Sequence, residues 1–455
     1  MAVTAHNCRL KSGKLVPVRN PSRMIGSSIY FENGLSEIAD AKSLYCWKHT
    51  LSNGSVRTDF VAFPGIVHFA KSNIADDEYD RIFVTGETGV QFRPTSGSVR
   101  NDTPSVWLFD RIHNSVVRHT LCKDVMDRVK VSVSGEIDRD KLRYTYFFIT
   151  WFDEYGYESG LSLPSFAKNG NEADWSDQTL EYNDGSVVHF EPVVVPVQAS
   201  GIRIYQAVTG SENENVQFIK EISGPQLSTV SVGFDIKISD ADAGEVYPDI
   251  TSAPDDLDEM IAVSGGFYAG RMRSKPHTVL FSALDNPTSW PLGNRYDVSD
   301  NIVCLATTSN TVFALTDGYP YVLSGTAPDT MSVASIAGPA ACVSPRAVCV
   351  LGNNLFYVSN YGLYVIANDA NAGTVCKCLT EKIFTKSQWQ ALNPSSAIMG
   401  QFDGALHLFF DNDIGMRGMI IDLNENADAV TTHDEIATCL ATDDRTDELY
   451  FVREV

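Results

Sequence analysis

A short hairpin pattern that repeats along the chain constrains its fold more than any other feature of the sequence. Residues 311–323 (TVFALTDGYPYVL) align without a gap on residues 354–366 (NLFYVSNYGLYVI), which lie 43 positions later. Each segment places a polar turn between two apolar strands, and residues 81–92 (RIFVTGETGVQF) fit the same template. Strand repeats of roughly 40–50 residues are typical of a β-propeller, in which one repeat forms a four-stranded sheet, or blade.

A second element recurs beside the first. Residues 106–119 resemble residues 418–433, with Asp110 and Asp422 each closing an apolar strand. An apolar strand closed by Asp and followed by another strand suits the outer half of a blade. Further starts of the repeat lie 43, 45, 49 and 41 residues apart, at Ile261, Cys304, Cys349, Ile398 and Cys439. The pattern predicts about six blades, with five or seven as alternatives.

The turns between the apolar runs favour β structure throughout. Asn-Gly and Asp-Gly tolerate the positive φ of the type I′ turns that join hairpin strands. These dipeptides are Asn33-Gly34, Asn53-Gly54, Asp184-Gly185, Asp317-Gly318 and Asp403-Gly404. Long helical patterns are scarce, so the sequence predicts an all-β protein.

The repeat is interrupted in the middle of the chain. Residues 141–165 form a long alternating strand with an acidic turn, and residues 201–222 form a hairpin with a polar tip. Both are typical of the central strands of a fibronectin type III-like or Ig-like β-sandwich. We therefore expect four parts: an extended N-terminal arm at 1–22, the first part of the propeller at 23–124, an inserted sandwich at 125–251 and the remainder of the propeller at 252–455.

The last repeat, residues 436–455, holds two strands. A propeller has to close, and an open blade would leave exposed strand edges. The hairpin at 43–63 offers the missing strands. We therefore expect the propeller to close by pairing strands from the two termini, with residues 436–455 beside part of residues 24–63.

The charge of the chain limits its partners. The formal net charge is −22 and the isoelectric point is near 4.7. Tight binding of nucleic acid needs Lys and Arg to displace counterions from phosphates, so this balance argues against it. It fits a soluble surface, and it also fits a conduit through which nucleic acid slides without being held. The opening residues have no apolar core of a secretory signal, and no apolar run is long enough to cross a bilayer.

Carboxylate motifs are the first candidates for chemistry. The run from Ser282 through Asp285 to Trp290 echoes a sialidase Asp-box, but its spacing is wrong, and we expect a tight turn whose Trp290 packs between blades. Asp411, Asp413 and Gly415 echo a calcium loop but lack its third acidic position and distal Glu, so a solvated turn is expected. The same holds for Asp240, Asp242 and Gly244.

Cysteine and histidine give no clearer site. Alternation along a strand puts Cys376 and Cys378 on one face, where we expect them to pack toward the core, since no further ligands for a metal follow. His407 reads as an ordinary strand residue. The sequence therefore predicts a protein that is not an enzyme, with no catalytic, cofactor-binding or metal-binding residues and no cofactor.

Several segments resemble a family of bacteriophage virion proteins that form the distal tail tube, or nozzle, of short-tailed phages. The likeness covers about a third of the chain, and its motifs are turn and packing patterns. The segments are TAHNCRLKSGKLVP (4–17), SAPDDLDEMIAVSGGFYAG (252–270), LFSALDNPTSWPLGNRYDV (280–298), VFALTDGYPYVLSGTAPDTM (312–331), CVSPRAV with NNLFYVSNYGLYVI (342–366), and LTEKIFTKSQW (379–389).

The resemblance implies a mechanical function in the tail of a virion, after synthesis in the cytoplasm of a bacterial host. Copies of the chain would form a homomeric ring, a hexamer, that continues the DNA-ejection channel and contacts the head-to-tail adaptor and the spikes or fibres. The lumen would be net negative and about 20 Å wide or more, so that double-stranded DNA passes without specific binding. Arg271, Arg273 and Lys275 would then lie at subunit or partner contacts, and the arm 1–22 would lie on a neighbouring copy.

Two other functions remain open. One is a carbohydrate-binding or polysaccharide-degrading propeller used in host recognition, which would present exposed Trp or Tyr side chains. The other is a cellular interaction scaffold.

Overall fold

The structure is a computed structural model. It describes residues 5–6, 8–11, 14–17, 29–31, 35, 37–50, 54–74, 77, 79–86, 106–112, 115–120, 128–134, 137–196, 199–208, 215–239, 243–309, 311–338, 340–369, 373–423, 430–443 and 446–453.

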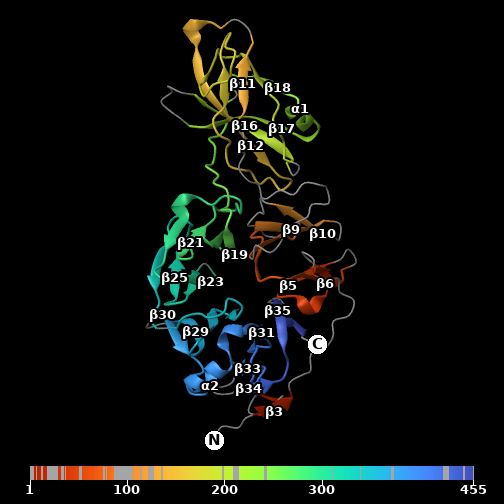
Figure 1. The fold of residues 1–455 in the computed structure, drawn as a ribbon, viewed down its shortest axis with the longest axis vertical. Coiled ribbons are helices and arrows are strands. Elements are labelled where there is room, and N and C mark those ends of the chain that lie inside the picture. Colours follow the sequence, from red (N-terminus) through yellow and green to blue (C-terminus); the bar gives the residue numbers. More distant parts are fainter. Residues whose placement is uncertain are drawn as a thin grey trace. The chain divides into compact units, whose positions relative to one another are not determined.

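The chain divides into two compact units, and each is built almost wholly from β-strands (Figure 1). Unit 1 comprises residues 1–117, 255–285 and 295–455, and unit 2 comprises residues 118–254 and 286–294. The helices of the described residues are α1 (Leu227–Val230), α2 (Lys386–Ala391) and the 3₁₀ turns Ile38–Asp40, Arg139–Lys141, Gly224–Gln226, Leu292–Asn294 and Pro394–Ser396. None of the helices in this part of the chain is long and apolar enough to span a membrane. The expected all-β class is confirmed.

Four sheets of unit 1 share one plan, in which four consecutive strands lie side by side in chain order. Their strands are β7 (Val67–Lys71), β8 (Ile82–Gly86), β9 (Val106–Ile112) and β10 (Ser115–Thr120); β19 (Leu257–Val263), β20 (Phe267–Met272), β21 (Thr278–Phe281) and β22 (Arg295–Asp297); β23 (Ile302–Thr308), β24 (Thr311–Thr316), β25 (Tyr321–Ser324) and β26 (Ser332–Ser335); and β27 (Val348–Leu351), β28 (Asn354–Ser359), β29 (Gly362–Asp369) and β30 (Gly373–Cys378). Turn chemistry produces this plan, because short polar connections let each strand fold back on the one before it.

A fifth sheet follows the same plan and gains one more strand. It contains β31 (Ile398–Phe402), β32 (Ala405–Phe409), β33 (Gly418–Asp422) and β34 (Val430–His433) in chain order. The additional strand is β1 (Ala5–His6), which pairs with β34 in parallel. β1 belongs to the N-terminal arm predicted at 1–22, and in the structure of the single chain it pairs with a sheet of that chain. The next two strands, β2 (Cys8–Lys11) and β3 (Lys14–Pro17), form an antiparallel hairpin.

The repeat units recognised in the sequence match this plan. The two aligned hairpins are the second and third strands of consecutive sheets, β24–β25 and β28–β29. The segments around Asp110 and Asp422 are both the third and fourth strands of a sheet. Ile261, Cys304, Cys349, Ile398 and Cys439 each lie on the first strand of their sheet. In 81–92, residues 82–86 are a second strand, β8, and residues 87–92 lie outside the described residues.

Two smaller sheets complete unit 1. One contains β5 (Ser43–Thr50), β6 (Val56–Phe63) and β4 (Ile29–Phe31), and the other contains β35 (Ala437–Asp443) and β36 (Glu448–Arg453). They share a core that includes Leu44 and Phe60 from one sheet and Cys439 and Val452 from the other. Residues 436–455 therefore pack beside part of 24–63, but the expected strand pairing between them is wrong, because the two segments form separate sheets.

The two small sheets lie face to face, whereas the sequence led us to expect one blade built from both. Tyr450 packs against Phe60 on β6, with ring centroids 5.1 Å apart. The next residue on the same strand, Phe451, packs against Phe409 on β32 at 5.2 Å. Successive side chains of a strand point to opposite faces of its sheet. The β35–β36 sheet is therefore covered on one face by β5–β6 and on the other by the β31–β34 sheet.

Apolar packing links the sheets of unit 1 in a closed order. Shared cores join β19–β22 to β23–β26, β23–β26 to β27–β30, and β27–β30 to β31–β34. A further core, with Trp47 and Ile82, joins β5–β6 to β7–β8. Phe83 on β8 then meets Tyr268 on β20 with ring centroids 5.3 Å apart, which completes the circuit. Both faces of a typical sheet are thus buried, and this explains its nearly continuous apolar runs.

Unit 2 contains two four-stranded sheets. Their strand orders are β13–β11–β15–β18 and β14–β12–β16–β17. The strands are β11 (Lys130–Val133), β12 (Arg143–Phe152), β13 (Phe166–Lys168), β14 (Leu180–Tyr182), β15 (Val187–Phe190), β16 (Gly201–Val208), β17 (Gln217–Ser223) and β18 (Phe234–Lys237). Phe147 from one sheet packs against Phe190 from the other, with ring centroids 5.5 Å apart, and both are fully buried.

A row of serines covers part of one edge of β12. The backbone N–H groups of Ser159, Ser162 and Ser165 donate to the carbonyls of Trp151, Ile149 and Phe147, at 2.9–3.0 Å. Their hydroxyl oxygens accept from the N–H groups of those same β12 residues, at 3.0–3.1 Å. We call these three residues the serine row. It satisfies backbone groups that an edge strand would otherwise leave open to another chain.

Candidate functional site: two buried ionic clusters

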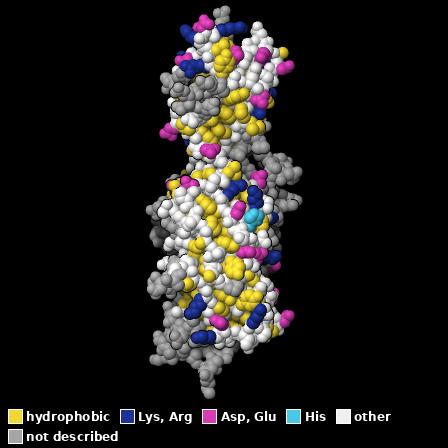
Figure 2. All heavy atoms as spheres, turned by 90° about the vertical axis from the view of Figure 1, so that its left-hand side faces the viewer, with side chains coloured by type: hydrophobic (Ala, Val, Ile, Leu, Met, Phe, Trp, Pro, Cys, Tyr) yellow, Lys and Arg dark blue, Asp and Glu magenta, His cyan; other side chains and the backbone are white. Residues whose placement is uncertain are grey.

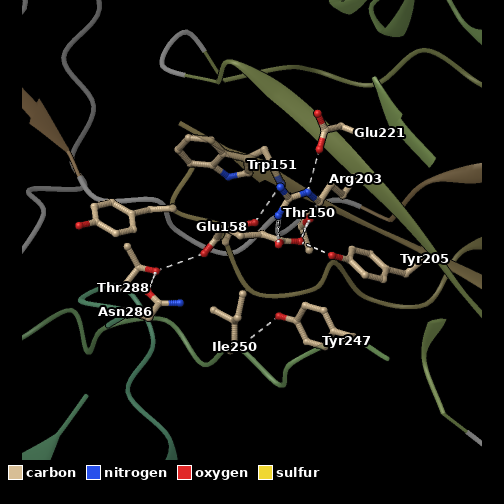
Figure 3. Close-up of polar contacts among 12 residues, drawn as sticks. Thr150, Trp151, Glu158, Arg203, Tyr205, Glu221, Tyr247, Ile250, Asn286 and Thr288 are labelled. Carbon is tan, nitrogen blue, oxygen red and sulfur yellow. Dashed lines mark hydrogen bonds and ion pairs between the residues drawn. The ribbon is translucent and has the colours of Figure 1, made fainter. Parts of the chain in front are cut away.

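Two clusters of buried charge among the described residues bring several strands together, one in each unit. The first, the Glu158 cluster, consists of Thr150, Glu158, Arg203, Tyr205 and Glu221 in unit 2 (Figure 3). The second, the Glu259 cluster, consists of His68, Asp258, Glu259, Arg271 and Arg273 in unit 1. A buried charge is costly unless it is paired and hydrogen-bonded, so each cluster calls for a physical explanation.

Glu158 lies just before the serine row, where the chain turns back along β12, and 5% of its surface is exposed. Its Oε1 accepts hydrogen bonds from the Thr150 hydroxyl at 2.5 Å and from the Tyr205 hydroxyl at 2.6 Å. Its Oε2 accepts from Nη1 of Arg203 at 2.5 Å. Figure 3 shows these three donors converging on one carboxylate. Thr150 and Arg203 are opposite each other on paired strands, so the sheet register itself delivers two of them.

Arg203 links this carboxylate to the surface of the unit. Its Nε donates to Glu221 at 3.1 Å, and its guanidinium lies 4.8 Å from the ring centroid of Phe152. Burial lowers the pKa of Arg203, but Glu158 and Glu221 outweigh that effect and the net pKa is raised. Burial and the neighbouring Glu158 also raise the pKa of Tyr205 well above its ordinary value. Arg203 therefore stays charged and Tyr205 stays a neutral donor.

The main chain of Glu158 receives a contact from the second segment of unit 2. The hydroxyl of Thr288 donates to the Glu158 carbonyl at 3.3 Å. Close by, Trp290 is fully buried, and its backbone N–H donates to the Thr251 carbonyl at 2.6 Å. Since both oxygens of the Glu158 carboxylate are engaged and enclosed, the cluster is built to hold segments together. A catalytic carboxylate would need to reach a substrate.

The Glu259 cluster joins three neighbouring sheets of unit 1. Oε1 of Glu259, on β19, accepts from the Leu305 N–H on β23 at 2.9 Å and lies 3.3 Å from Nδ1 of His68 on β7. Arg271 on β20 binds Asp258 at 2.6 Å and donates to the carbonyls of Ile302 and Val303. Its Nε lies 3.6 Å from Oε2 of Glu259. First strands of consecutive sheets are thus tied together by charge.

Lys48 makes a comparable link between the two small sheets. Its Nζ lies 3.2 Å from Asp443 on β35 and also pairs with Glu448 on β36. Burial lowers the pKa of Lys48, but the hydrogen bonds to Glu448 and Asp443 outweigh burial and raise it above the ordinary value. The hydrogen bond from Lys48 in turn lowers the pKa of Glu448.

The Asp-box-like run is divided between the units. Ser282 and Asp285 lie in unit 1, where the Ser282 hydroxyl accepts from the Tyr268 N–H at 2.9 Å and the Asp285 N–H donates to the Gly266 carbonyl at 2.7 Å. Trp290 lies in unit 2. The expectation that Trp290 packs between blades is wrong, because the connection from β21 to β22 leaves unit 1 and supplies residues 286–294 to the other core.

The remaining candidates lie apart from the clusters. Asp411 is in an exposed turn and pairs with Arg417 at 3.5 Å. Residues 240–242, with the acidic pair Asp240 and Asp242, lie outside the described residues; the N–H of the following Gly244 donates to the Phe218 carbonyl.

His407 is a strand residue on β32, as predicted, opposite Gly400. No group of three or more His, Cys, Asp or Glu side chains suited to a metal ion occurs in the described part of the chain, including the turn with Asp413 and Gly415.

The two cysteines of the CxC pair lie on β30, where both are partly buried. Cys376 packs against a core cluster and lies 3.3 Å from the Tyr357 hydroxyl, and Cys378 lies 3.8 Å from the hydroxyl of Thr380. Burial raises the pKa of the Cys376 thiol, which keeps it protonated and unreactive.

Of the three basic residues expected at partner contacts, Arg271 is enclosed in the Glu259 cluster and Arg273 shares Asp258 with it at 2.7 Å. Lys275 is exposed.

No protein-family model matches the chain. No curated protein matches it either. Among solved structures, apo AztD from Citrobacter koseri is 11% identical with a TM-score of 0.27, over 68% of this chain and 76% of that one. Selenomethionine-substituted virginiamycin B lyase from Staphylococcus aureus is 7% identical with a TM-score of 0.24, over 67% of this chain and 99% of that one. Likeness at these TM-scores assigns neither a fold nor an activity.

Proposed function

We propose that unit 1 is a β-propeller of seven blades, one more than the repeat spacing predicts. The closed order of packing supports this count, since five sheets of the common plan are joined by the β4–β6–β5 and β35–β36 sheets as two separate blades. The opposite directions of Tyr450 and Phe451 argue against merging those two sheets into one.

Unit 2 is, on the same proposal, a sandwich of the fibronectin III or Ig-like type inserted into the propeller. Its β14–β12–β16–β17 sheet supports this assignment, because the central pair is a long strand and a later hairpin strand, as in the sheet that contains strands C, F and G of Ig-like domains. The register of eight paired positions between β12 and β16 makes this pair the spine of the unit.

We further propose that the protein is a structural component of a phage tail: a homomeric ring, a hexamer, that continues the DNA channel and supports spikes or fibres. The observation that carries this proposal is the use of buried charge. Glu259, Arg271 and Lys48 each tie one sheet to the next. Such ties favour one arrangement of rigid parts, which is what a load-bearing conduit needs, while a net charge of −22 repels passing phosphate. The nozzle-like segments found in the sequence point the same way.

The surface of unit 1 suits contacts with other proteins. Its lower part in Figure 2 presents Lys and Arg beside Asp and Glu, with apolar side chains between them. A mixed surface of this kind fits a subunit or partner contact, which is polar at its rim and apolar within. A wall facing DNA would be more uniformly acidic.

Electron microscopy of the purified protein, and of particles that contain it, tests the ring. We expect closed rings of identical copies around a net negative lumen of about 20 Å or more, the width that duplex DNA requires. Isolated monomers at micromolar concentration, or a lumen lined by Lys and Arg, would contradict the proposal.

A specific observation favours glycan binding as a second candidate. Tyr319 and Tyr361 are 49% and 47% exposed, and they lie in the connections between the second and third strands of consecutive sheets. Equivalent connections emerge at the same end of their sheets, so the two rings share one face of unit 1. Affinity electrophoresis in host polysaccharide tests this candidate: loss of retardation in Tyr319→Ala would support it, and no retardation of the unmodified chain would exclude it.

A further inference from the structure

The first residues of the chain differ in charge from the rest. Residues 1–31 contain five Lys or Arg and no Asp or Glu, whereas the whole chain carries −22. We call residues 1–17 the basic arm. Copies of so acidic a protein repel one another, so a ring of them gains from a positive segment at each subunit boundary.

The structure shows where this arm attaches. Ala5 and His6 pair in parallel with Thr431 and Thr432 on β34, the outer strand of a sheet that already has four antiparallel strands. The hairpin β2–β3 follows immediately. β34 therefore presents an edge that accepts a strand from a segment remote in sequence, the mode of recognition called β-strand addition.

The attachment is short enough to be exchanged. A ladder of two residues provides few hydrogen bonds, and each of them contributes only modestly to stability. The four antiparallel strands beneath it are joined by their own ladders and a shared core, so they do not depend on β1. The same pairing made between two copies would conserve every contact of the pairing made within one, which is the condition for exchange of an element between subunits.

Acidic residues follow the accepting edge. Residues 434–453, directly after β34, contain six Asp or Glu and two Arg. Glu435 pairs with Arg453 at 3.2 Å, and Lys48 pairs with Asp443 and Glu448, which still leaves the segment with more acidic than basic charges. In the sequence, the excess of negative charge directly after the accepting edge is complementary to a basic arm from another copy.

We propose that in the assembled protein the basic arm of each copy adds its strand to β34 of the next copy, in the register Ala5 to Thr431. This proposal rests on the proposed ring, and it names the contact that joins neighbours. The arm then acts as a clasp: it crosses each subunit boundary, adds a fifth strand to the receiving sheet and offsets the repulsion between acidic bodies.

Cysteine cross-linking between isotopically distinct copies tests the clasp. The full chain carries Ala5→Cys and Thr431→Cys, which can form a disulfide because the Cα atoms of paired strand residues lie within disulfide range. The native Cys8 is replaced by Ser. Light and 15N-labelled chains are mixed before assembly, oxidised and digested, and the mass of the disulfide-linked peptide that joins positions 5 and 431 is measured. Exchange predicts that about half of the linked peptides are hybrids of light and heavy chains, the random share for pairing between copies.

The outcomes separate the clasp from the ring. Linked peptides without hybrids, or no disulfide at all between positions 5 and 431, would overturn the clasp even in a particle that is a ring by electron microscopy. Hybrid links in an open dimer would support the clasp and overturn the ring. The single variants Ala5→Cys and Thr431→Cys give the background of links to native cysteines.

A charge variant provides a matched control. Arg9→Gln, Lys11→Gln and Lys14→Gln together keep the backbone pairing and remove charge. We expect this variant to melt like the unmodified chain but to assemble more weakly, with less dependence on salt. Equal assembly at low salt would contradict the electrostatic part of the proposal.

Discussion

At the scale of single residues, the charges that hold the two clusters together have partners from distant parts of the sequence. Glu158 follows an apolar strand and Glu259 lies within one, and a carboxylate at such a position is ordinarily solvated. Their donors, Arg203 and Tyr205 for one and Leu305 for the other, lie about 45 residues away. No local pattern encodes such a meeting, so neither cluster was predicted. The serine row is visible in the sequence as a serine at every third position. This spacing differs from the two-residue period of a strand, so no prediction followed from it.

Replacing Glu158 by Gln should destabilise unit 2 strongly. Arg203, whose side chain is 29% exposed, would keep its charge with only Glu221 to balance it, and the loss of its charged hydrogen-bond acceptor should cost about 1.5–3 kcal/mol. The free energy of unfolding is followed by hydrogen exchange of unit 2 peptides in urea. Glu221→Gln is the control: that side chain is 40% exposed, so a loss below about 1 kcal/mol is expected. Equal losses in the two variants would show that enclosure of the pair is unimportant.

Asp77 provides a pH-dependent test. It pairs with Arg81 at 2.8 Å in the loop between β7 and β8. Burial raises the pKa of Asp77, but the hydrogen bonds from Arg81 outweigh it and the net pKa falls below 3.8. A carboxylate whose pKa is lower in the folded state than in the unfolded state stabilises the fold at pH values above the unfolded-state pKa. This stabilisation is lost as the pH falls through the folded-state pKa.

We therefore expect Asp77→Asn to be less stable than the unmodified chain near neutral pH. The difference should shrink as the pH falls below 3.8, because protonated Asp77 no longer gains from Arg81. Urea unfolding at a series of pH values measures the difference. A gap that is independent of pH would mean that Asp77 acts through packing alone.

At the scale of strands and sheets, the repeat in the sequence predicted most of unit 1. Apolar strand, polar turn and apolar strand recur because each sheet has to cover the next with the same two faces. The pattern could not reveal how many sheets there are, since the two small sheets carry fewer strands and the period alone does not distinguish one sheet from two. In the structure the β35–β36 strands and the β4–β6–β5 strands form separate sheets.

Ser162→Ala tests the serine row. Its hydroxyl accepts from the Ile149 N–H at 3.0 Å, so the substitution leaves a buried backbone donor without this acceptor, at a cost of about 1–3 kcal/mol. Thermal unfolding of the full chain reports the change. Ser228→Ala removes an exposed hydroxyl that donates to the Pro225 carbonyl, and it should alter stability by a few tenths of a kcal/mol at most. A similar small change for Ser162 would mean that water replaces the hydroxyl.

At the scale of the whole molecule, the chain enters unit 2 twice. A change in the strand pattern led us to expect an inserted domain at 125–251, and the first segment of unit 2 comprises residues 118–254. The second, at 286–294, was hidden inside a repeat, because a long connection between two strands has no periodicity to mark where it goes. Trp290 was the residue most open to misreading, since a buried Trp in a propeller sequence is ordinarily assigned to the propeller.

A fragment of residues 118–254 should melt cooperatively but at a lower temperature than one joined by a flexible linker to residues 286–294. The second segment adds a fully buried Trp290 and the hydrogen bonds from Thr288 and Trp290 to residues 158 and 251. Differential scanning calorimetry of the two fragments measures the effect. Identical melting temperatures would show that residues 286–294 add nothing to the unit, and a fragment that fails to melt cooperatively would show that residues 118–254 are not an independent core.

The contact between the two small sheets can form only at the end of translation, because its strands lie near opposite ends of the sequence. Lys48 and Glu448 are 400 residues apart, and a ribosome adding about 5–20 residues per second takes roughly 20–80 s to make the second after the first. Throughout that time Leu44, Phe60 and Ala62 have no partner strand to cover them. The β5–β6 hairpin is therefore synthesised first and buried last. Its apolar face is the part of this core that a holding chaperone would protect for the longest time.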